Sequence, residues 1–312
     1  MKQIASLSLD LDNQWSYMKT HGDAAWQAFP SYLDHVVPRI LGFLQDRGLK
    51  ITFFIVGQDA ALEKNRDAIA AIVDAGHEIA NHSFNHEPWL HLYSRDELVR
   101  EFERTEEALE AITGKVPVGF RGPGFSLSPT VLEVLGERGY EYDCSILPTF
   151  ISPLARAFFF LRSPDVSPEE REKLKKLFGK FSDGFQTLKP HYIESGGRKM
   201  VEIPVSTFPV VKTPFHASYL MYLFTFSPFL ARTYWKMAVS ACRMTGVQPS
   251  LLLHPLDFLA GDDIAELKFF PGMNVASAKK VEFLGEILGL FSDNFDILSM
   301  REHADHFRGG RA

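Results

Sequence analysis

Cysteine is nearly absent from this chain, which has only Cys144 and Cys242 among its 312 residues. The two are far apart and form no Cys-x-x-Cys spacing, which argues against a disulfide framework and against a metal site built from thiolates. We expect both to be small buried side chains. The chain also lacks an uninterrupted apolar run of the ~18 residues that a membrane-spanning helix needs.

An excess of positive charge is missing too. Lysine and arginine number 33 against 39 aspartates and glutamates, so the net charge is −6. Because the chain has no basic arm and no RNA-binding signature, nucleic acid is not an expected partner. The first residues, Met1-Lys2-Gln3-Ile4, lead directly into a strand pattern and lack the long apolar segment of a secretory signal. The sequence therefore predicts a cytoplasmic protein.

Most of the chain consists of short apolar strand patterns that alternate with helical patterns. This alternation indicates a parallel sheet, and about eight such units are typical of a closed or nearly closed barrel. We therefore predict an α/β fold in which residues 1–312 form one domain. Residues 151–199 fit the alternation poorly and are predicted to be an insertion that caps one end of the barrel. The predicted strands cover residues 4–11, 51–56, 78–80, 116–120, 140–144, 201–205, 250–253 and 295–299.

Two histidines and two carboxylates are candidate metal ligands. His82 and His86 lie side by side if the chain turns helically between them. Asp10 and Asp12 share one face of the first predicted strand. A catalytic zinc-type site needs three protein ligands and one open position for water. One aspartate is then the third ligand, and the other can accept the proton of that water. Zinc is the expected metal, while cobalt, nickel, manganese and iron accept the same nitrogen and oxygen ligands.

Further polar residues follow other predicted strands. Arg121 opens a Gly/Pro turn and is a candidate charge partner for Asp10. The amides of Gly124 and Phe125 in the same turn can point at a developing oxyanion. His254 directly follows an apolar strand and can protonate a leaving amine. Because the working residues of such barrels sit at the C-terminal ends of strands, we expect these groups to converge.

An imidazole that transfers protons is usually oriented by a second group. Glu202 and Asp143, two acidic residues on other predicted strands, are the candidates for orienting His254. The sequence leaves the choice between them open, and a plain structural hydrogen-bonding role is the alternative for each.

At these residues the chain resembles the polysaccharide deacetylase family, the carbohydrate esterases with NodB homology. Its first, second and third motifs resemble Leu9-Asp10-Leu11-Asp12-Asn13, His82-Ser83-Phe84-Asn85-His86 and Arg121-Gly122-Pro123-Gly124-Phe125. The last motif resembles residues 251–254, and residues 51–57 look like the second strand of the family. The resemblance covers about 3–144 and 201–306, in the correct order.

The resemblance implies a distorted, incomplete (β/α) barrel of about seven strands. It also implies that Asp12, His82 and His86 bind the metal, and that Asp10 is the catalytic base, tethered by Arg121. His254 would be the catalytic acid. The implied reaction is hydrolysis of an N-acyl group, usually acetyl, from an amino sugar.

Three departures from the family pattern concern the same site. The acidic pair is split as Asp-x-Asp, whereas the commonest family form has the two aspartates adjacent. Gly124 stands where many members have an aromatic residue. The fourth motif, normally an aspartate with a nearby tryptophan, has no clear match, so the resemblance names no partner for His254.

The substrate is the part of the hypothesis that the motifs leave open. A cytoplasmic family member is expected to act on a lipid-linked sugar or another biosynthetic intermediate. Residues 154–162 and 215–235 are apolar and aromatic with basic edges, which is typical of segments that lie in the membrane interface. They predict a peripheral contact at the inner face of the membrane, with a cap or barrel-packing helix as the alternative.

Two other functions stay open at this point. One is deacylation of a soluble amino-sugar or nucleotide-sugar intermediate. The other is a non-catalytic sugar- or lipid-binding module whose metal is structural. A binding module needs neither Asp10 nor Arg121, so the presence of both beside the expected metal ligands favours an enzyme.

Overall fold

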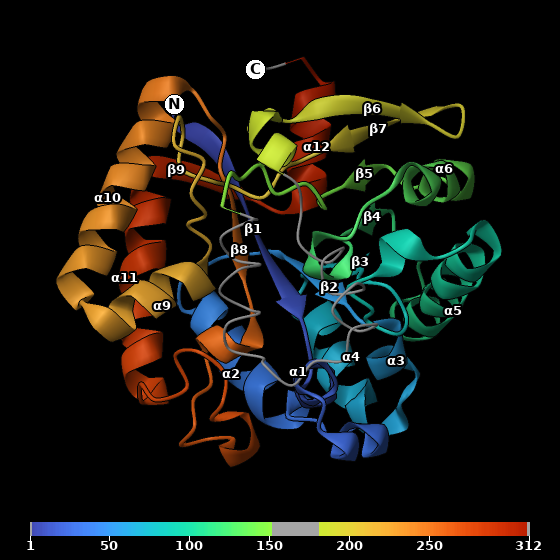
Figure 1. The fold of residues 1–312 in the computed structure, drawn as a ribbon, viewed down its shortest axis with the longest axis horizontal. Coiled ribbons are helices and arrows are strands. Elements are labelled where there is room, and N and C mark those ends of the chain that lie inside the picture. Colours follow the sequence, from blue (N-terminus) through green and yellow to red (C-terminus); the bar gives the residue numbers. More distant parts are fainter. Residues whose placement is uncertain (1, 152–180, 311–312) are drawn as a thin grey trace.

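A computed structural model describes residues 2–151 and 181–310, which form a sheet surrounded by helices (Figure 1). The longest of the described strands, β1 (Gln3–Leu11), pairs in parallel with its neighbours on both sides. The order across the sheet is β6-β7-β5-β4-β3-β2-β1-β8, and β9 pairs with the start of β1. The other strands are β2 (Thr52–Ile55), β3 (Glu78–Asn81), β4 (Gly119–Phe120), β5 (Tyr142–Asp143), β6 (His191–Ser195), β7 (Arg198–Glu202), β8 (Ser250–Leu253) and β9 (Phe295–Leu298).

The sheet curves into an incomplete barrel. Its two ends approach where the chain leaves β7, because the Ser206 amide donates to the Ser250 carbonyl at 3.2 Å and the Ser250 amide donates to Ser206 Oγ at 2.6 Å. Every strand pairing is parallel except the β6–β7 hairpin. The predicted α/β fold with a parallel, barrel-like sheet is therefore confirmed.

Two details differ from the sequence prediction. The described residues contain nine strands rather than about seven, because residues 191–202 form a hairpin and β9 occupies the start of β1. Of the segment 151–199, which was predicted to be an insertion, residues 191–195 form β6 and residue 198 begins β7. Residues 152–180 lie outside the described part of the chain.

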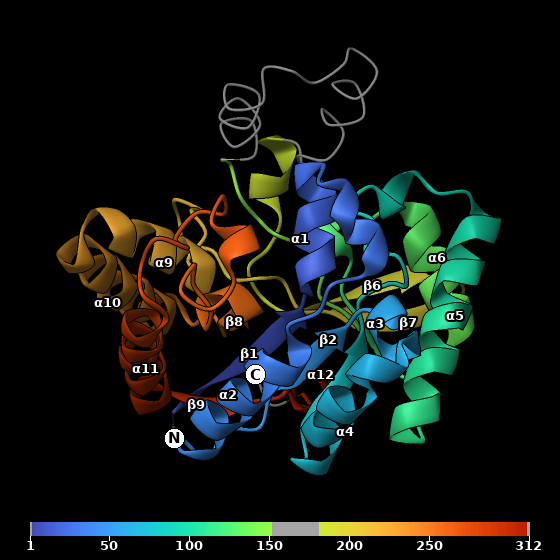
Figure 2. The same cartoon turned by 90° about the horizontal axis from the view of Figure 1, so that it is seen from below.

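Helices cover the outside of the sheet, and the termini of several are set by the local sequence (Figure 2). The helix α5 begins with a capping box between Ser94 and Glu97 and ends at Gly114 in the left-handed conformation. The helices are α1 (Gln14–His21), α2 (Leu33–Gln45), α3 (Gly57–Ala61), α4 (Arg66–Asp74), α5 (Arg95–Thr113), α6 (Pro129–Arg138), α9 (Ala217–Phe226), α10 (Pro228–Thr245), α11 (Ser277–Asn294) and α12 (Met300–Arg308). None within residues 2–151 or 181–310 combines the length and apolar character needed to cross a bilayer.

The two faces of β1 have different roles. Leu7, Leu9 and Leu11 belong to the main hydrophobic core, together with residues of α2, α10 and α11. Successive side chains of a strand point to opposite faces, so Ser8 and Asp10 face the other way, into the barrel. The strand therefore carries polar groups into the barrel while its apolar face anchors it to the helices.

The strand registers decide what meets at the C-terminal edge. Leu11 pairs with Ile55, Ile55 with Asn81, and Asn81 with Phe120, while on the other side Leu9 pairs with Leu253. The residues that follow these pairs include Asp12, His82, Arg121 and His254. Four parts of the chain thus deliver polar side chains to one edge of the sheet.

Candidate metal centre

Asp12, His82 and His86 converge at this edge. One ligand atom from each lies within 4.8 Å of the others. Asp12 Oδ1 is 2.9 Å from His86 Nε2 and 3.4 Å from His82 Nε2. One carboxylate oxygen and two imidazole nitrogens form a donor set that a zinc-type catalytic site uses, so these residues fit a divalent cation.

The His82 ring is oriented for such a role. Its Nδ1 lies 2.7 Å from the Arg121 carbonyl oxygen, which can only accept. His82 therefore donates from Nδ1 and keeps the Nε2 lone pair toward Asp12, an arrangement that fixes ligand orientation in metal sites.

The surroundings shift the pKa values of Asp12 and His82 in opposite directions. Burial alone would raise the pKa of Asp12, but His86 and His82 outweigh it and hold this pKa well below its usual value. Burial alone would lower the pKa of His82, but Asp10 and Asp12 raise it. The carboxylate is therefore kept in the ionised form that a cation requires.

The histidine pair lies on an irregular loop and not on a helical turn. Ser83 and His86 have φ values of 62° and 51°, in the left-handed region that non-glycine residues seldom adopt. Such strained conformations persist where the surroundings over-determine them.

Glu101 of α5 holds this loop and was missed at the sequence level. Its carboxylate accepts from the Phe84 amide at 3.0 Å, the Asn85 amide at 2.6 Å and Asn85 Nδ2 at 2.7 Å. The start of α3 adds the Gly57 amide, which donates to the Ser83 carbonyl at 2.8 Å. The sequence did offer one signal for this role, because Glu101 is an acidic residue at a position that the helical pattern of α5 assigns to its buried face.

Asp10 lies beside the ligand set but is bound to Arg121. Asp10 Oδ1 is 2.6 Å from Arg121 Nη1, and Asp10 Oδ2 is 3.9 Å from His82 Nε2. Arg121 is fully buried, stacks over the Phe54 ring at 4.2 Å and donates through Nε to the Cys144 carbonyl at 3.0 Å. Burial would lower the pKa of Arg121, but Asp10 raises it, so the guanidinium stays charged.

Two tyrosines support Asp12, and neither was singled out in the sequence. Tyr17, on α1, donates its hydroxyl to Asp12 Oδ2 at 3.2 Å. Tyr32 donates to the Asp12 carbonyl at 2.5 Å. Burial, and then the charge of Asp12, raises the pKa of Tyr17 well above its usual value, so this hydroxyl remains a hydrogen-bond donor.

The expected oxyanion donors are only partly available. The turn Pro123–Phe125 uses the Phe125 amide internally, because it donates to the Gly122 carbonyl at 2.9 Å. Phe125 is therefore not a free donor. Gly124 is exposed with a φ of 58°, and among the described residues its amide has no acceptor.

His254 has partners other than the predicted ones. Its Nδ1 is 3.1 Å from Ser218 Oγ, which is 2.9 Å from Asp257 Oδ1. Within residues 2–151 and 181–310, neither Asp143 nor Glu202 hydrogen-bonds His254, so the structure corrects that expectation. The two carboxyl groups are instead held by each other's strand and by the residues that follow β5.

Asp143 and Glu202 instead face each other on β5 and β7. Asp143 accepts from the Ser145 hydroxyl at 2.7 Å, and Glu202 accepts from the Ile146 amide at 3.1 Å. Burial, and then the proximity of Asp143, raises the pKa of Glu202 well above its usual value. The two carboxyl groups form a buried pair near Arg121.

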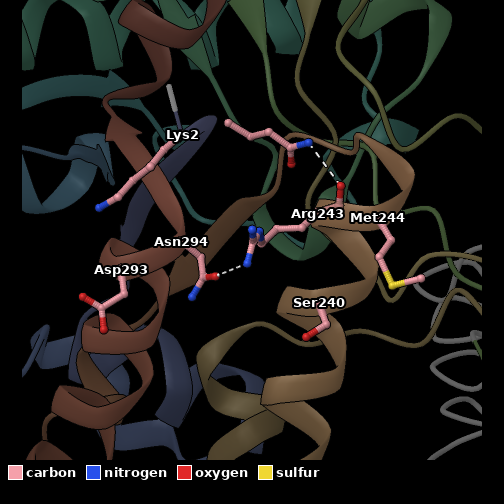
Figure 3. A pocket seen from close by; sticks show the side chains of 7 residues that line it. Lys2, Ser240, Arg243, Met244, Asp293 and Asn294 are labelled. Carbon is pink, nitrogen blue, oxygen red and sulfur yellow. Dashed lines mark hydrogen bonds between the residues drawn. The ribbon is translucent and has the colours of Figure 1, made fainter.

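A surface hollow of about 830 Å³ lies at the opposite end of β1 (Figure 3). Its lining includes Lys2 and Gln3 of the first residues, with Arg243 and Asn294 joined by a 2.9 Å hydrogen bond. It contains none of the candidate ligands. The C-terminal edge, where working residues of such barrels gather, remains the candidate site.

Comparison with protein families and curated proteins gives matches over part of the chain. A family model described as polysaccharide deacetylase matches residues 18–142, which include His82, His86 and Arg121. A peptidoglycan deacetylase of Helicobacter pylori is 29% identical over 38% of this chain and 39% of its own length. A peptidoglycan-N-acetylglucosamine deacetylase of Bacillus cereus is 36% identical over 28% of this chain and 30% of its own length. The chain therefore spans well under half of these relatives.

Solved structures share the fold along the whole chain. A Mycobacterium smegmatis protein assigned to the polysaccharide deacetylases superposes with a TM-score of 0.61 at 20% identity, covering 100% of this chain and 96% of that protein. The Puue allantoinase superposes with a TM-score of 0.59 at 15% identity, covering 99% and 91%. At these identities the likeness shows the distorted barrel and nothing about activity.

Proposed function

Because a family model described as polysaccharide deacetylase matches residues 18–142, we propose that this chain is a metal-dependent hydrolase that removes an N-acyl group, expected to be acetyl, from an amino sugar. The observation that carries the proposal is the convergence of Asp12, His82 and His86 beside an aspartate bound to a buried arginine. Relatives named peptidoglycan and chitin deacetylases make N-acetylglucosamine polymers the first substrates to test.

The roles of the residues follow from their contacts. A divalent cation held by Asp12, His82 and His86 would polarise the acyl carbonyl and lower the pKa of a nearby water. Asp10 is the proposed base, and the Arg121 guanidinium, whose Nη1 is 2.6 Å from Asp10 Oδ1, holds it in place. The exposed Gly124 amide is the proposed donor to the developing oxyanion. His254 is the proposed acid that protonates the leaving amine. Zinc is the proposed metal, with cobalt, nickel, manganese and iron as alternatives.

The ion pair between Asp10 and Arg121 favours catalysis over mere binding. A sugar- or lipid-binding module with a structural metal would gain nothing from a second carboxylate tied to a buried arginine beside its ligands. Burying such a pair removes two charges from water, which is unfavourable unless their geometry is good. A hydrolase, by contrast, needs a carboxylate next to the metal that is not itself a ligand.

The finer part of the proposal is a lipid-linked substrate met at the inner face of the membrane. Support comes from the tip of the α9–α10 hairpin, where Phe226, Phe229 and Leu230 are 70%, 77% and 57% exposed. Other parts of the predicted segment 215–235 pack inward, since Leu220 and Trp235 are buried in the core. The second predicted segment, 154–162, lies outside the described residues. Deacylation of a soluble intermediate is the alternative, and it would need no membrane contact.

The test uses zinc-loaded protein with N-acetylglucosamine oligomers, and acetate release is measured. We expect Asp10→Asn to keep its zinc and to lose about 10²–10⁴-fold in turnover, the usual contribution of a general base. We expect His86→Ala to lose zinc as well, measured by elemental mass spectrometry. Asp74→Asn, at an exposed carboxylate on α4, is the matched control. Unchanged turnover in Asp10→Asn would contradict the base, and full zinc occupancy in His86→Ala would contradict the ligand set.

A further inference from the structure

A second group of polar side chains surrounds His254 at the end of β8. The turn Pro255–Asp257 follows His254 directly and contributes Asp257, which is 1% exposed. The first turn of α9 contributes Ser218. Segments about 36 residues apart in the chain therefore meet at one imidazole.

The hydrogen bonds in this group have a defined direction. Ser218 has a single hydroxyl hydrogen, and an ionised carboxylate can only accept. Ser218 therefore donates to Asp257 Oδ1 at 2.9 Å, and its oxygen accepts from His254 Nδ1 at 3.1 Å. The proton of the neutral His254 ring is thereby placed on Nδ1.

Asp257 also holds the main chain of His254. Its second oxygen, Oδ2, accepts from the His254 amide at 2.7 Å. Lys280 lies behind this turn and donates to the carbonyls of Leu256 and Leu259 at 2.8 and 2.9 Å. One carboxylate therefore orients both the backbone and, through Ser218, the ring of the same histidine.

We propose that Ser218 and Asp257 are positioning residues that hold one proton of His254 on Nδ1, so that the doubly protonated ring gives its Nε2 proton to the amine of the substrate and returns to the neutral Nδ1–H form. This inference rests on the acid role of His254 in the proposed function. This relay through Ser218 and Asp257 would supply the orienting group for His254, for which the sequence offers no clear match to the family's fourth motif.

The other group packed against His254 is His216. Its ring centroid is 5.9 Å from that of His254, it is 8% exposed, and its Nδ1 has no hydrogen-bond partner among the described residues. Burial, and then the charges of His254 and Arg121, lowers the pKa of His216 to about 3. His216 therefore stays neutral and does not compete for Asp257.

Substitution of Asp257 by asparagine is expected to reverse the direction of the hydrogen bonds between residue 257, Ser218 and His254. The His254 amide still requires an acceptor, so the asparagine oxygen faces it and the NH₂ group faces Ser218. Ser218 then accepts from that group and turns its hydroxyl toward His254 Nδ1. The proton of the neutral ring moves to Nε2, so the ring can no longer take up at Nε2 the proton that it is to give to the leaving amine.

The experiment reads the tautomer of His254 by long-range ¹H–¹⁵N NMR on zinc-loaded protein, with His254→Gln identifying its signal. We expect Nδ1–H in the parent protein and in Ser218→Thr, a mixture in Ser218→Ala, and Nε2–H in Asp257→Asn. With N-acetylglucosamine oligomers we expect kcat to fall at least about tenfold in Ser218→Ala and further in Asp257→Asn, with KM little changed. Ser240→Ala, an exposed serine on α10, is the matched control.

An Nδ1–H signal that persists in both Ser218→Ala and Asp257→Asn would overturn the relay. So would a change of tautomer that leaves kcat at the parent value. The NMR result does not depend on turnover. A parent protein that releases no acetate would count against the proposed function, and the tautomer of His254 would still show whether Ser218 and Asp257 orient its ring. If Ser218→Ala fails to fold, Asp257→Asn alone decides the relay, because an Nδ1–H signal in that variant contradicts it.

Discussion

Single side chains hold the loops of this site in place, and Glu101 is the clearest example. It is 4% exposed, and its carboxylate accepts three hydrogen bonds from the loop that presents His82 and His86. The loop includes residues in a strained conformation, and buried amides without acceptors are costly. The geometry of the ligands therefore depends on a residue that does not touch the metal position.

We expect Glu101→Ala to weaken zinc binding about 10–100-fold, the usual effect of losing a group that orients ligands. We also expect it to lower the free energy of unfolding by about 3 kcal/mol, because amides of Phe84 and Asn85 lose their acceptor. Zinc titration and urea unfolding measure the two effects. Glu107→Ala, at an exposed position of the same helix, is the control. Zinc affinity equal to the parent in Glu101→Ala would show that the loop does not need this carboxylate.

The convergence of the candidate ligands could be predicted because each motif is local. Spacing selected His82, His86 and one of the two aspartates, the family resemblance chose Asp12, and the structure brings these three residues together. Tyr17 and Glu101 were not selected, because a tyrosine or a glutamate on a helix is ordinarily a packing or solvated residue. Their contacts exist only once α1 and α5 are packed against the sheet.

At the level of elements, the helix α9 connects the candidate site with an apolar surface. The helix α9 starts at the site, where Ser218 contacts His254, and ends at the exposed Phe226. Eight residues of helix span about 12 Å. An apolar tip at that distance would let the protein rest on a membrane while a lipid-linked sugar enters the site.

We expect the protein to float with anionic vesicles, and the double variant Phe226→Ser with Phe229→Ser to float at least about tenfold less. Burying one phenylalanine contributes roughly 1.5–3 kcal/mol, so losing two exceeds that factor. Met244→Ser, which removes an 87% exposed side chain at the other end of α10, is the control. A parent protein that stays entirely in the aqueous fraction would rule out the contact and favour a soluble substrate.

For the whole molecule, buried neutral histidines link folding to pH. His303 on α12 is 0% exposed, with Nδ1 2.9 Å from Ser6 Oγ and Nε2 3.0 Å from Gln248 Oε1. Burial, and then the neighbouring His306, lowers its pKa to about 4. The unfolded chain would protonate this histidine near pH 6.5, so between about pH 6.5 and 4 the unfolded state binds more protons.

We therefore expect the free energy of unfolding to fall as the pH drops from about 6.5 to 4, with His303 accounting for about 3 kcal/mol. His303→Gln should have a lower free energy of unfolding at neutral pH, and that free energy should change less between pH 6.5 and 4 than in the parent protein. Urea unfolding in EDTA at several pH values measures this without metal. His21→Gln, at an exposed histidine, is the control. Parallel stability curves for His303→Gln and the parent would contradict the linkage.

The sequence by itself determined the α/β barrel and the side chains that meet at its edge. Strand periodicity is local, and a ligand that directly follows a strand is delivered to the same edge as its neighbours. Only the tertiary structure decided the partner of His254, the internal use of the Phe125 amide and the support from Glu101. Those contacts join segments whose proximity depends on strand order and helix packing, and neither is encoded in the spacing of residues along one segment.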